Sequence, residues 1–310
     1  MESSQRIVAI LLSTYNGEAY LHEQLRSFEA QSHPYWRIFW RDDGSNDGTR
    51  AIMTQFIARV GEMRCREIGS HKERLGIQKS FFSLLKAAQD YPFLAFADQD
   101  DVWLPEKVAR ALQYLQRVAE GRPALYCARQ IIVDKNLRPL RWSPTFRPDV
   151  SLLSCLTQNI ATGCTILLNQ SAAHLIAQTR PPEDSLHDWW SYIVVTTAGG
   201  DVFFDNVPCI LYRQHEKNAV GGRSVGFRIW RALHKRPASV LGVIDAHAKA
   251  VNDSVPNVSS IARENLLALE RALRGTVWAR LRFVLTGRLR RQRLLESLLL
   301  NLWVLGGRIE

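Results

Sequence analysis

Apolar and polar residues alternate in blocks along the first hundred positions of the chain. Short apolar runs followed by polar residues rich in Ser, Asp and Gly are typical of buried parallel strands. Between these runs, apolar residues recur every three or four positions, which predicts amphipathic helices. Parallel strands need crossover connections, so the pattern predicts a doubly wound α/β sheet. The expected strands are 7–12, 36–41, 64–68 and 93–97.

Three polar loops follow strands of this predicted sheet. The carboxyl ends of parallel strands meet at one edge, and open α/β sheets bind their ligands there. We therefore expect the three loops to form one site. They are residues 13–17, 42–49 and 98–103.

The pattern changes in the second half of the chain. Beyond Gly221 and Gly222, strand patterns give way to basic and apolar residues at helical spacing, so we place a domain boundary near residue 220. The expectation is an α/β domain over 1–220 and a basic helical region over 221–310. The elements expected before the boundary are strands at 124–133, 159–168, 201–204 and 207–212, a helix at 187–196, and an irregular loop at 138–149.

Composition narrows the class of protein. A chain of 310 residues exceeds the usual size of one core, and 46% hydrophobic residues exclude a disordered chain. The five cysteines are scattered and never spaced as C-x-x-C, so we expect neither disulfides nor zinc, and a reducing cytoplasm. The N-terminus has no basic leader, and no apolar run is long enough for a spanning helix. We expect no signal peptide and no membrane crossing.

The net charge of +10 comes entirely from the C-terminal region. Residues 1–220 hold 24 basic and 24 acidic side chains, whereas residues 221–310 hold 16 and 6. Cations interleaved with Trp and Leu suggest helices that lie on an anionic membrane surface. The alternative is a packing region with solvated arginines. Nucleic acid is not expected as a partner, because no recognition motif accompanies the charge.

Three carboxylates follow the buried run 93–97 directly. The period of a strand points Asp98 and Asp100 to the same side, and two like charges at that spacing repel unless a cation or a proton intervenes. A hard divalent cation that also binds a diphosphate satisfies this need. Asp101 is either a further ligand or the cap of a helix that begins near Pro105.

Four motifs, taken in order and spacing, resemble those of family 2 inverting glycosyltransferases of the GT-A fold. The residues around Asp98 and His187 are similar to those of bacterial rhamnosyltransferase-like members. The resemblance covers about residues 5–215 and implies a Rossmann-like, mostly parallel sheet flanked by helices. The motifs are 8–17, 42–49, 97–103 and 187–190.

The resemblance implies how the donor is held. Ser13 and Tyr15 would touch the base or ribose, and Asp43 would accept a hydrogen bond from a pyrimidine imide N–H. A carboxylate only accepts hydrogen bonds, which suits uracil or thymine. The alternative for residues 42–49 is a turn that opens a helix.

By the same resemblance, residues 98–100 are the D-x-D motif. Asp100 would ligate Mg²⁺ or Mn²⁺, with Asp98 nearer the ribose or a metal-bound water. His215 is a candidate metal ligand or diphosphate contact, or else a structural histidine at a strand end.

Cations elsewhere in the chain are candidates for diphosphate binding. Arg213 and Lys217 suit phosphate oxygens, and Lys79 is a weaker candidate that otherwise lies on a solvated helix face. Trp103 is either the floor of the sugar site or a core aromatic residue. Residues 162–164 are expected to line the acceptor side, since glycine lets the backbone approach a sugar.

Asp188 is the candidate catalytic base. Inverting transfer needs one carboxylate to take the proton of the acceptor hydroxyl while its oxygen attacks the anomeric carbon. The resemblance places this residue at the start of a helix, with His187 as a neighbour. Alternatively Asp188 caps that helix, and Glu183 or Asp184 is the base.

The predicted activity is metal-dependent transfer of a sugar from a pyrimidine nucleoside diphosphate to a saccharide or lipid-linked saccharide hydroxyl. By resemblance the donor is dTDP-L-rhamnose and the pathway is a bacterial surface polysaccharide such as O-antigen or capsule. The alternatives are a hexosyltransferase that uses a UDP-sugar, a nucleotidyltransferase, and a non-catalytic binding module. A nucleotidyltransferase would carry a Gly-rich loop after the first strand, which residues 13–17 do not provide.

Overall fold

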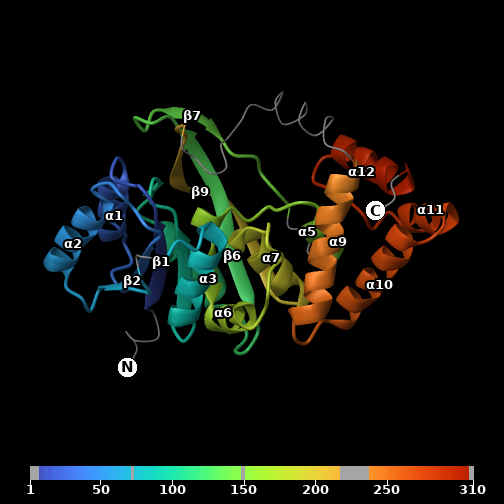
Figure 1. The fold of residues 1–310 in the computed structure, drawn as a ribbon, viewed down its shortest axis with the longest axis horizontal. Helices are drawn as coiled ribbons and strands as arrows, with labels where there is room; N and C mark the ends of the chain where they lie inside the picture. Colours follow the sequence, from blue (N-terminus) through green and yellow to red (C-terminus); the bar gives the residue numbers. More distant parts are fainter. Residues whose placement is uncertain (1–6, 71–72, 148–150, 217–236, 307–310) are drawn as a thin grey trace.

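A computed structural model describes residues 7–70, 73–147, 151–216 and 237–306. Within these residues one nine-stranded sheet runs in the order β3-β2-β1-β4-β8-β6-β9-β5, with β7 beside β6 (Figure 1). The strands are β1 (Val8–Thr14), β2 (Trp36–Asp42), β3 (Cys65–Glu67), β4 (Phe93–Ala97), β5 (Val102–Trp103), β6 (Ala124–Val133), β7 (Pro139–Trp142), β8 (Leu167–Asn169) and β9 (Asp201–Arg213).

The N-terminal half of the sheet is parallel, as predicted. Strand β1 pairs with β2 on one side and β4 on the other, so Thr14 lies opposite Asp42 and Leu12 opposite Ala97. The loops that follow these three strands therefore begin at the same edge of the sheet. The connecting helices are α1 (Leu21–Glu29), α2 (Thr49–Val60) and α3 (Ile77–Ala88).

The second half of the sheet is mixed. Strand β8 is antiparallel to both β4 and β6, while the long pairing of β6 with β9 is parallel. Because the longer pairings are parallel, the expected mostly parallel sheet is confirmed. The remaining elements before residue 216 are α4 (Lys107–Leu115), α5 (Leu152–Thr157), the 3-10 turn η2 (Gly163–Thr165), α6 (Gln170–Ala177) and α7 (His187–Thr197).

Three predictions about this half were wrong in detail. The strand expected at 159–168 is mostly a buried loop ending in η2, and only β8 pairs. The two strands expected at 201–212 are one strand, because Asp205 accepts the Val207 N–H (2.9 Å) at a register shift and the chain stays extended. The loop expected at 138–149 contains β7, which pairs with the end of β6.

The sheet separates two apolar cores. Along β1, Ile10 faces α1, α2 and α4 on one side, while Leu11 faces α3, α5, α6 and α7 on the other. A strand that is covered on both faces has no polar face, which is why the first strand reads as a continuous apolar run.

Between residues 237 and 306 the structure contains four helices. The side chains of Leu241, Val251 and Leu266 belong to the same core as α5 and α7, so α9 and α10 pack on the sheet domain. The predicted boundary near residue 220 falls in 217–236, outside the described residues, and the division into two domains stays a prediction. None of the helices described is both long and apolar enough to cross a bilayer. These helices are α9 (Pro237–Ser254), α10 (Ser260–Arg274), α11 (Val277–Leu285) and α12 (Leu294–Gly306).

Candidate active site

The first two loops are joined by hydrogen bonds. The Asn16 N–H donates to the Ser45 hydroxyl (2.9 Å), and the Asn16 side-chain carbonyl accepts the Asn46 N–H (2.9 Å). Asn16 has a φ of 49°, a left-handed conformation that Asn tolerates better than most residues. The Gly17 N–H then donates to the Thr49 hydroxyl (2.8 Å). These bonds hold the two predicted donor loops in place without a ligand.

The first loop is also joined to the 98–101 turn. The Tyr15 N–H donates to the Gln99 side-chain oxygen (2.8 Å), and the Gln99 amide donates back to the Tyr15 carbonyl (2.9 Å). The Tyr15 side chain is 39% exposed, with the Arg74 guanidinium 4.3 Å from its ring centre. Tyr15 thus offers a stacking surface at the site. Sequence reasoning did not predict this contact of Gln99 with Tyr15.

Asp43 is anchored from several sides. One carboxylate oxygen accepts from the Arg41 guanidinium and the Leu75 N–H (2.6 Å each), and the other accepts the Gly76 N–H (2.9 Å). Among the described residues, the second oxygen accepts this one hydrogen bond, and a carboxylate oxygen can accept another. Asp42 forms the turn that was the alternative for this loop, since it accepts from the N–H and hydroxyl of Ser45 (3.0 and 2.5 Å).

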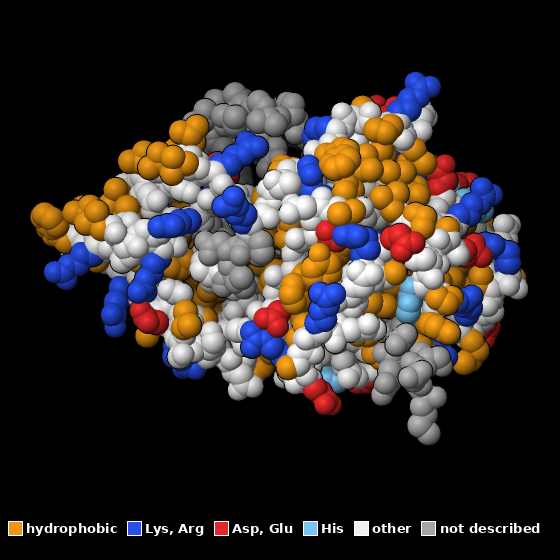
Figure 2. Space-filling view, turned by 180° about the vertical axis from the view of Figure 1, so that it is seen from behind, with side chains coloured by type: hydrophobic (Ala, Val, Ile, Leu, Met, Phe, Trp, Pro, Cys, Tyr) orange, Lys and Arg blue, Asp and Glu red, His pale blue; other side chains and the backbone are white. Residues whose placement is uncertain are grey.

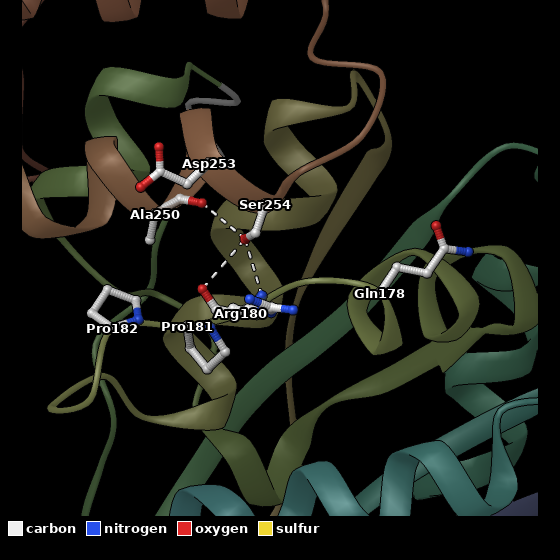
Figure 3. Close-up of a pocket in the computed structure, with 7 residues that line it drawn as sticks. All are labelled: Gln178, Arg180, Pro181, Pro182, Ala250, Asp253 and Ser254. Carbon is white, nitrogen blue, oxygen red and sulfur yellow. Dashed lines mark hydrogen bonds between the residues drawn. The ribbon is translucent and has the colours of Figure 1, made fainter.

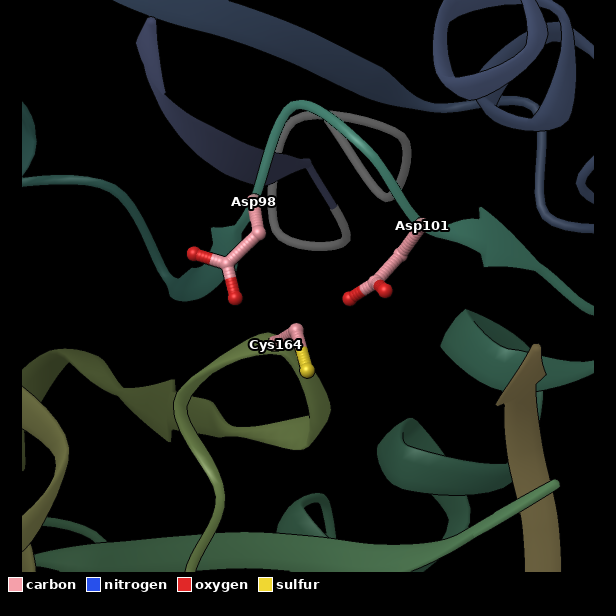
Figure 4. Close-up of side chains that lie close together, drawn as sticks. All are labelled: Asp98, Asp101 and Cys164. Carbon is pink, nitrogen blue, oxygen red and sulfur yellow. The ribbon is translucent and has the colours of Figure 1, made fainter. Parts of the chain in front are cut away.

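Asp98 and Asp101 lie on the two limbs of the turn after β4, and both point toward Cys164 (Figure 4). The candidate ligand atoms of these three residues lie within 4.8 Å of one another. Burial raises the pKa of Asp98 to about 7, and the charges of Asp100 and Asp188 add to the effect. Burial also raises the pKa of Asp101 well above its ordinary value. The turn concentrates negative charge that a cation would relieve.

Asp101 does not cap a helix. Strand β5 follows it, and α4 begins only at Lys107. One Asp101 oxygen accepts the Arg213 N–H (3.1 Å), while the other is buried and has no hydrogen-bond partner among the described residues. An unpaired buried carboxylate oxygen is costly, so Asp101 is a further candidate ligand.

Asp100 pairs with His215 rather than with Asp98. The His215 Nε2 lies 2.8 Å from the Asp100 carboxylate, and its ring lies against Tyr20, with centres 4.7 Å apart. The expected metal set is therefore divided into two neighbouring groups, Asp100 with His215 and Asp98 with Asp101 and Cys164. Sequence reasoning missed Cys164 as part of the group.

The predicted phosphate cations are placed differently from one another. The Arg213 side chain is buried, and its guanidinium donates to the Asp100 carbonyl (2.8 Å), the Lys135 carbonyl (2.6 Å) and the Glu23 carboxylate. It therefore tethers the turn, and its predicted role in diphosphate binding stays a prediction. Lys79 is exposed in the first turn of α3. Lys217 lies outside the described residues.

Asp188 lies in the first turn of α7 and is buried. Its two oxygens accept from the Trp189 N–H (2.6 Å) and the Gly163 N–H (3.1 Å). Burial raises the pKa of Asp188 to about 6. The cap position is Leu186, so Asp188 is not the cap, and the rival bases Glu183 and Asp184 are exposed.

His187 and Trp103 are packing residues. The His187 ring stacks on Phe81 (3.8 Å between centres), and burial lowers its pKa to about 3, which keeps the imidazole neutral. Trp103 is 2% exposed and packs edge-on against Phe28, so it is the core aromatic of the two alternatives and not a sugar platform.

Helix α9 holds the segment that leads into α7. The Ser254 hydroxyl accepts the Arg180 N–H (3.0 Å) and lies 3.3 Å from the Arg180 carbonyl, beside an open hollow of about 520 Å³ (Figure 3). Further along, His247 Nε2 lies 2.9 Å from the Ser185 hydroxyl. None of the predicted site residues lines the hollow, so it is a junction between segments and not the site.

The chain is similar in sequence to known proteins. Residues 9–175 match the model of the family described as glycosyl transferase family 2. The dTDP-rhamnosyl transferase RfbG of Shigella flexneri is 28% identical over 242 residues, which cover 73% of this chain and 77% of that protein. The putative teichuronic acid biosynthesis glycosyltransferase TuaG of Bacillus subtilis is 30% identical over 115 residues, 37% of this chain and 44% of that protein.

A solved structure has a similar fold. The crystal structure of residues 1–349 of TarS from S. aureus, in complex with UDP-GlcNAc, superimposes with a TM-score of 0.60 at 18% identity. The match covers 84% of this chain and 70% of that one. At this identity the likeness concerns the fold, and it confirms the predicted GT-A class.

Proposed function

This chain belongs to glycosyl transferase family 2, and on that premise we propose that it transfers a sugar from a pyrimidine nucleoside diphosphate to a saccharide hydroxyl, with inversion. One observation carries the proposal. Asp98, at the end of β4, and Asp188, at the start of α7, come from distant parts of the chain and meet at residues 163–164. Asp188 accepts the Gly163 N–H (3.1 Å), and the candidate ligand atoms of Cys164, Asp98 and Asp101 lie within 4.8 Å of one another. Such a transfer needs one carboxylate that can hold a metal ion and a second, close by, that can act as the base.

The donor is proposed to be dTDP-L-rhamnose. Support comes from the relative RfbG, whose name describes a dTDP-rhamnosyl transferase. Tyr15 supplies an exposed ring for the base, and the Asp43 oxygen bonded to Gly76 has room for the imide N–H of thymine. Ser13, at the end of β1, is proposed to contact the ribose.

The carboxylates fit a divalent cation. The unpaired oxygen of Asp101 and the raised pKa of Asp98 are both expected where a cation belongs. Mg²⁺ and Mn²⁺ are hard cations that prefer oxygen, so the proposed ligand atoms are the carboxylate oxygens rather than the Cys164 sulfur. We propose Asp98, Asp100 and Asp101 as ligands, with His215 orienting Asp100. When bound, the ion would act as a Lewis acid that stabilises charge on the departing nucleoside diphosphate.

Asp188 is proposed as the base. A pKa of about 6 leaves most of the carboxylate ionised at neutral pH yet still basic enough to take a proton. The acceptor oxygen forms a bond to the anomeric carbon as the bond to the diphosphate breaks, and the hydroxyl proton moves to Asp188. A single displacement of this kind inverts the anomeric configuration. The bonds from Gly163 and Trp189 hold the carboxylate in position.

The acceptor is proposed to be a growing bacterial surface polysaccharide, free or lipid-linked. The name of the relative TuaG, which refers to teichuronic acid biosynthesis, supports a polymer of this class. Residues 162–164 are proposed to face the acceptor. They lie beside Asp188, because the Gly163 N–H donates to its carboxylate.

Two substitutions test the proposal. Asp188→Asn is expected to bind donor normally and to lose transfer by about 10²–10⁴-fold, as removal of a general base does. Asp100→Ala is expected to abolish the stabilisation that dTDP-L-rhamnose with Mn²⁺ gives in a thermal-shift measurement. Glu183→Gln is the matched control, an exposed carboxylate on the same segment, and should do neither. Normal transfer by Asp188→Asn would refute the assignment of the base.

A further inference from the structure

The last two helices both expose large apolar side chains. Trp278 on α11 is 75% exposed and Leu295 on α12 is 79% exposed. On α12 the exposed leucines recur at positions i, i+1, i+4 and i+8, which is one face of a helix. We call these residues the α11–α12 face: Trp278, Leu285, Leu294, Leu295, Leu298 and Leu302.

The same region carries uncompensated positive charge. Residues 275–306 hold six arginines and one acidic residue. Arg282, Arg290 and Arg293 are exposed and form no ion pair within the described part of the chain. Arg288, by contrast, is neutralised by Glu264 (2.9 Å). Figure 2 shows hydrophobic and basic side chains gathered at the end of the molecule that these helices form.

Leucines and a tryptophan bordered by arginines that form no ion pair with other described residues fit an anionic lipid surface. Apolar side chains enter the boundary between headgroups and acyl chains, while cations bind the phosphates. A second copy of the chain fits less well, because a two-fold interface would place the same arginines against one another. A membrane-spanning role does not fit either, since the helices described are too short or too polar.

We propose that the α11–α12 face docks the protein on an anionic membrane surface, with both helices lying in the plane of the interface. The face is at the opposite end of the molecule from α1 and α2 (Figure 1). The donor loops lead into those two helices, so docking leaves the donor entrance in water. This inference concerns binding alone and does not depend on the proposed transfer.

Sedimentation of the full chain with lipid vesicles tests the proposal. We expect binding to vesicles of phosphatidylcholine mixed with phosphatidylglycerol, and little binding to phosphatidylcholine alone. Each of Arg282→Gln and Arg293→Gln should weaken binding roughly fivefold, and added salt should weaken it in the wild type. The double variant Leu295→Glu/Leu298→Glu should abolish it.

Met63→Glu is the matched control. Met63 is 74% exposed on the turn after α2, at the other end of the molecule, so its replacement should leave vesicle binding unchanged. The salt dependence and the arginine variants test the face even if the leucine variant unfolds.

Three outcomes would overturn the proposal. The first is no binding to anionic vesicles, and the second is equal binding to both kinds of vesicle. The third is a dimer in solution that Leu295→Glu/Leu298→Glu dissociates while vesicle binding persists, because a second copy would then cover the face. Donor binding measured on the same variants separates this result from any failure of the proposed transfer.

Discussion

Replacing Arg213 with Met should loosen the turn that carries Asp98, Asp100 and Asp101. The buried guanidinium joins this turn to Glu23 and to the Lys135 carbonyl, and the Arg213 backbone N–H, which the substitution keeps, binds Asp101. Methionine fills the volume but donates no hydrogen bond. The substitution therefore separates the shape of the side chain from its function as a tether.

The expected loss of stability depends on whether each acceptor of the Arg213 guanidinium can bind water after the substitution. Glu23 is 48% exposed and Lys135 is exposed, so both regain water and contribute little. The Asp100 carbonyl is partly buried, and a buried acceptor without a partner costs about 1–3 kcal/mol. We expect a loss of about 2 kcal/mol, or a fall in Tm on the order of 5 °C.

The larger effect should be on ligand affinity. Groups that orient metal ligands typically change affinity by about 10–100-fold when they are removed. Urea unfolding measures the stability, and titration of Mn²⁺ with the donor measures the affinity. Arg122→Met is the matched control, since it removes an exposed arginine–carboxylate pair with Asp201 at the other end of β9. If Arg213→Met lowers affinity no more than Arg122→Met does, Arg213 does not hold the site.

Three further outcomes are expected. The value of kcat/KM should fall as the pH drops through about 6, because Asp188 must be ionised to take a proton, and a flat profile from about pH 5 to 7 would contradict this. Gly163→Ala should lower the free energy of unfolding in urea by about 1–3 kcal/mol and should also lower kcat. The new Cβ would lie 2.8 Å from His187 Nε2 and would displace the turn that carries Asp188. Wild-type stability and kcat would show that this turn adjusts without cost. A chain ending at residue 216 should aggregate in light-scattering measurements, because it uncovers the apolar surface that α9 and α10 bury, and a soluble product with wild-type Tm would show that the sheet domain is independent.

Local pattern was sufficient for the parallel half of the fold. The run 93–97 was predicted with the bounds that the structure gives, since a strand buried on both faces must be apolar throughout. The same reasoning gave a wrong prediction for residues 159–168, which are apolar but mostly form a buried loop. A loop buried under α7 needs apolar side chains as much as a strand does, so burial alone could not distinguish the two.

The candidate site was predictable where a motif is contiguous and not where it depends on distant contacts. Asp98 and Asp100 follow a strand directly, and resemblance to the family placed Asp188. The tether formed by Arg213 depends on β9 returning beside the turn, which no local spacing records. The opposing position of Cys164 likewise depends on how η2 packs against β4.

The bond between His247 and Ser185 limits how segments of this chain can be exchanged with those of a relative. It links α9 to the residues just before Asp188. The segment that carries Asp188 and the C-terminal helices therefore cannot be replaced independently of each other. In a chimaera that joins this sheet domain to the C-terminal helices of a relative, a different helix would contact the segment that leads to Asp188. Chimaeras designed to change acceptor specificity or membrane binding should therefore take α7 and α9 from the same parent protein.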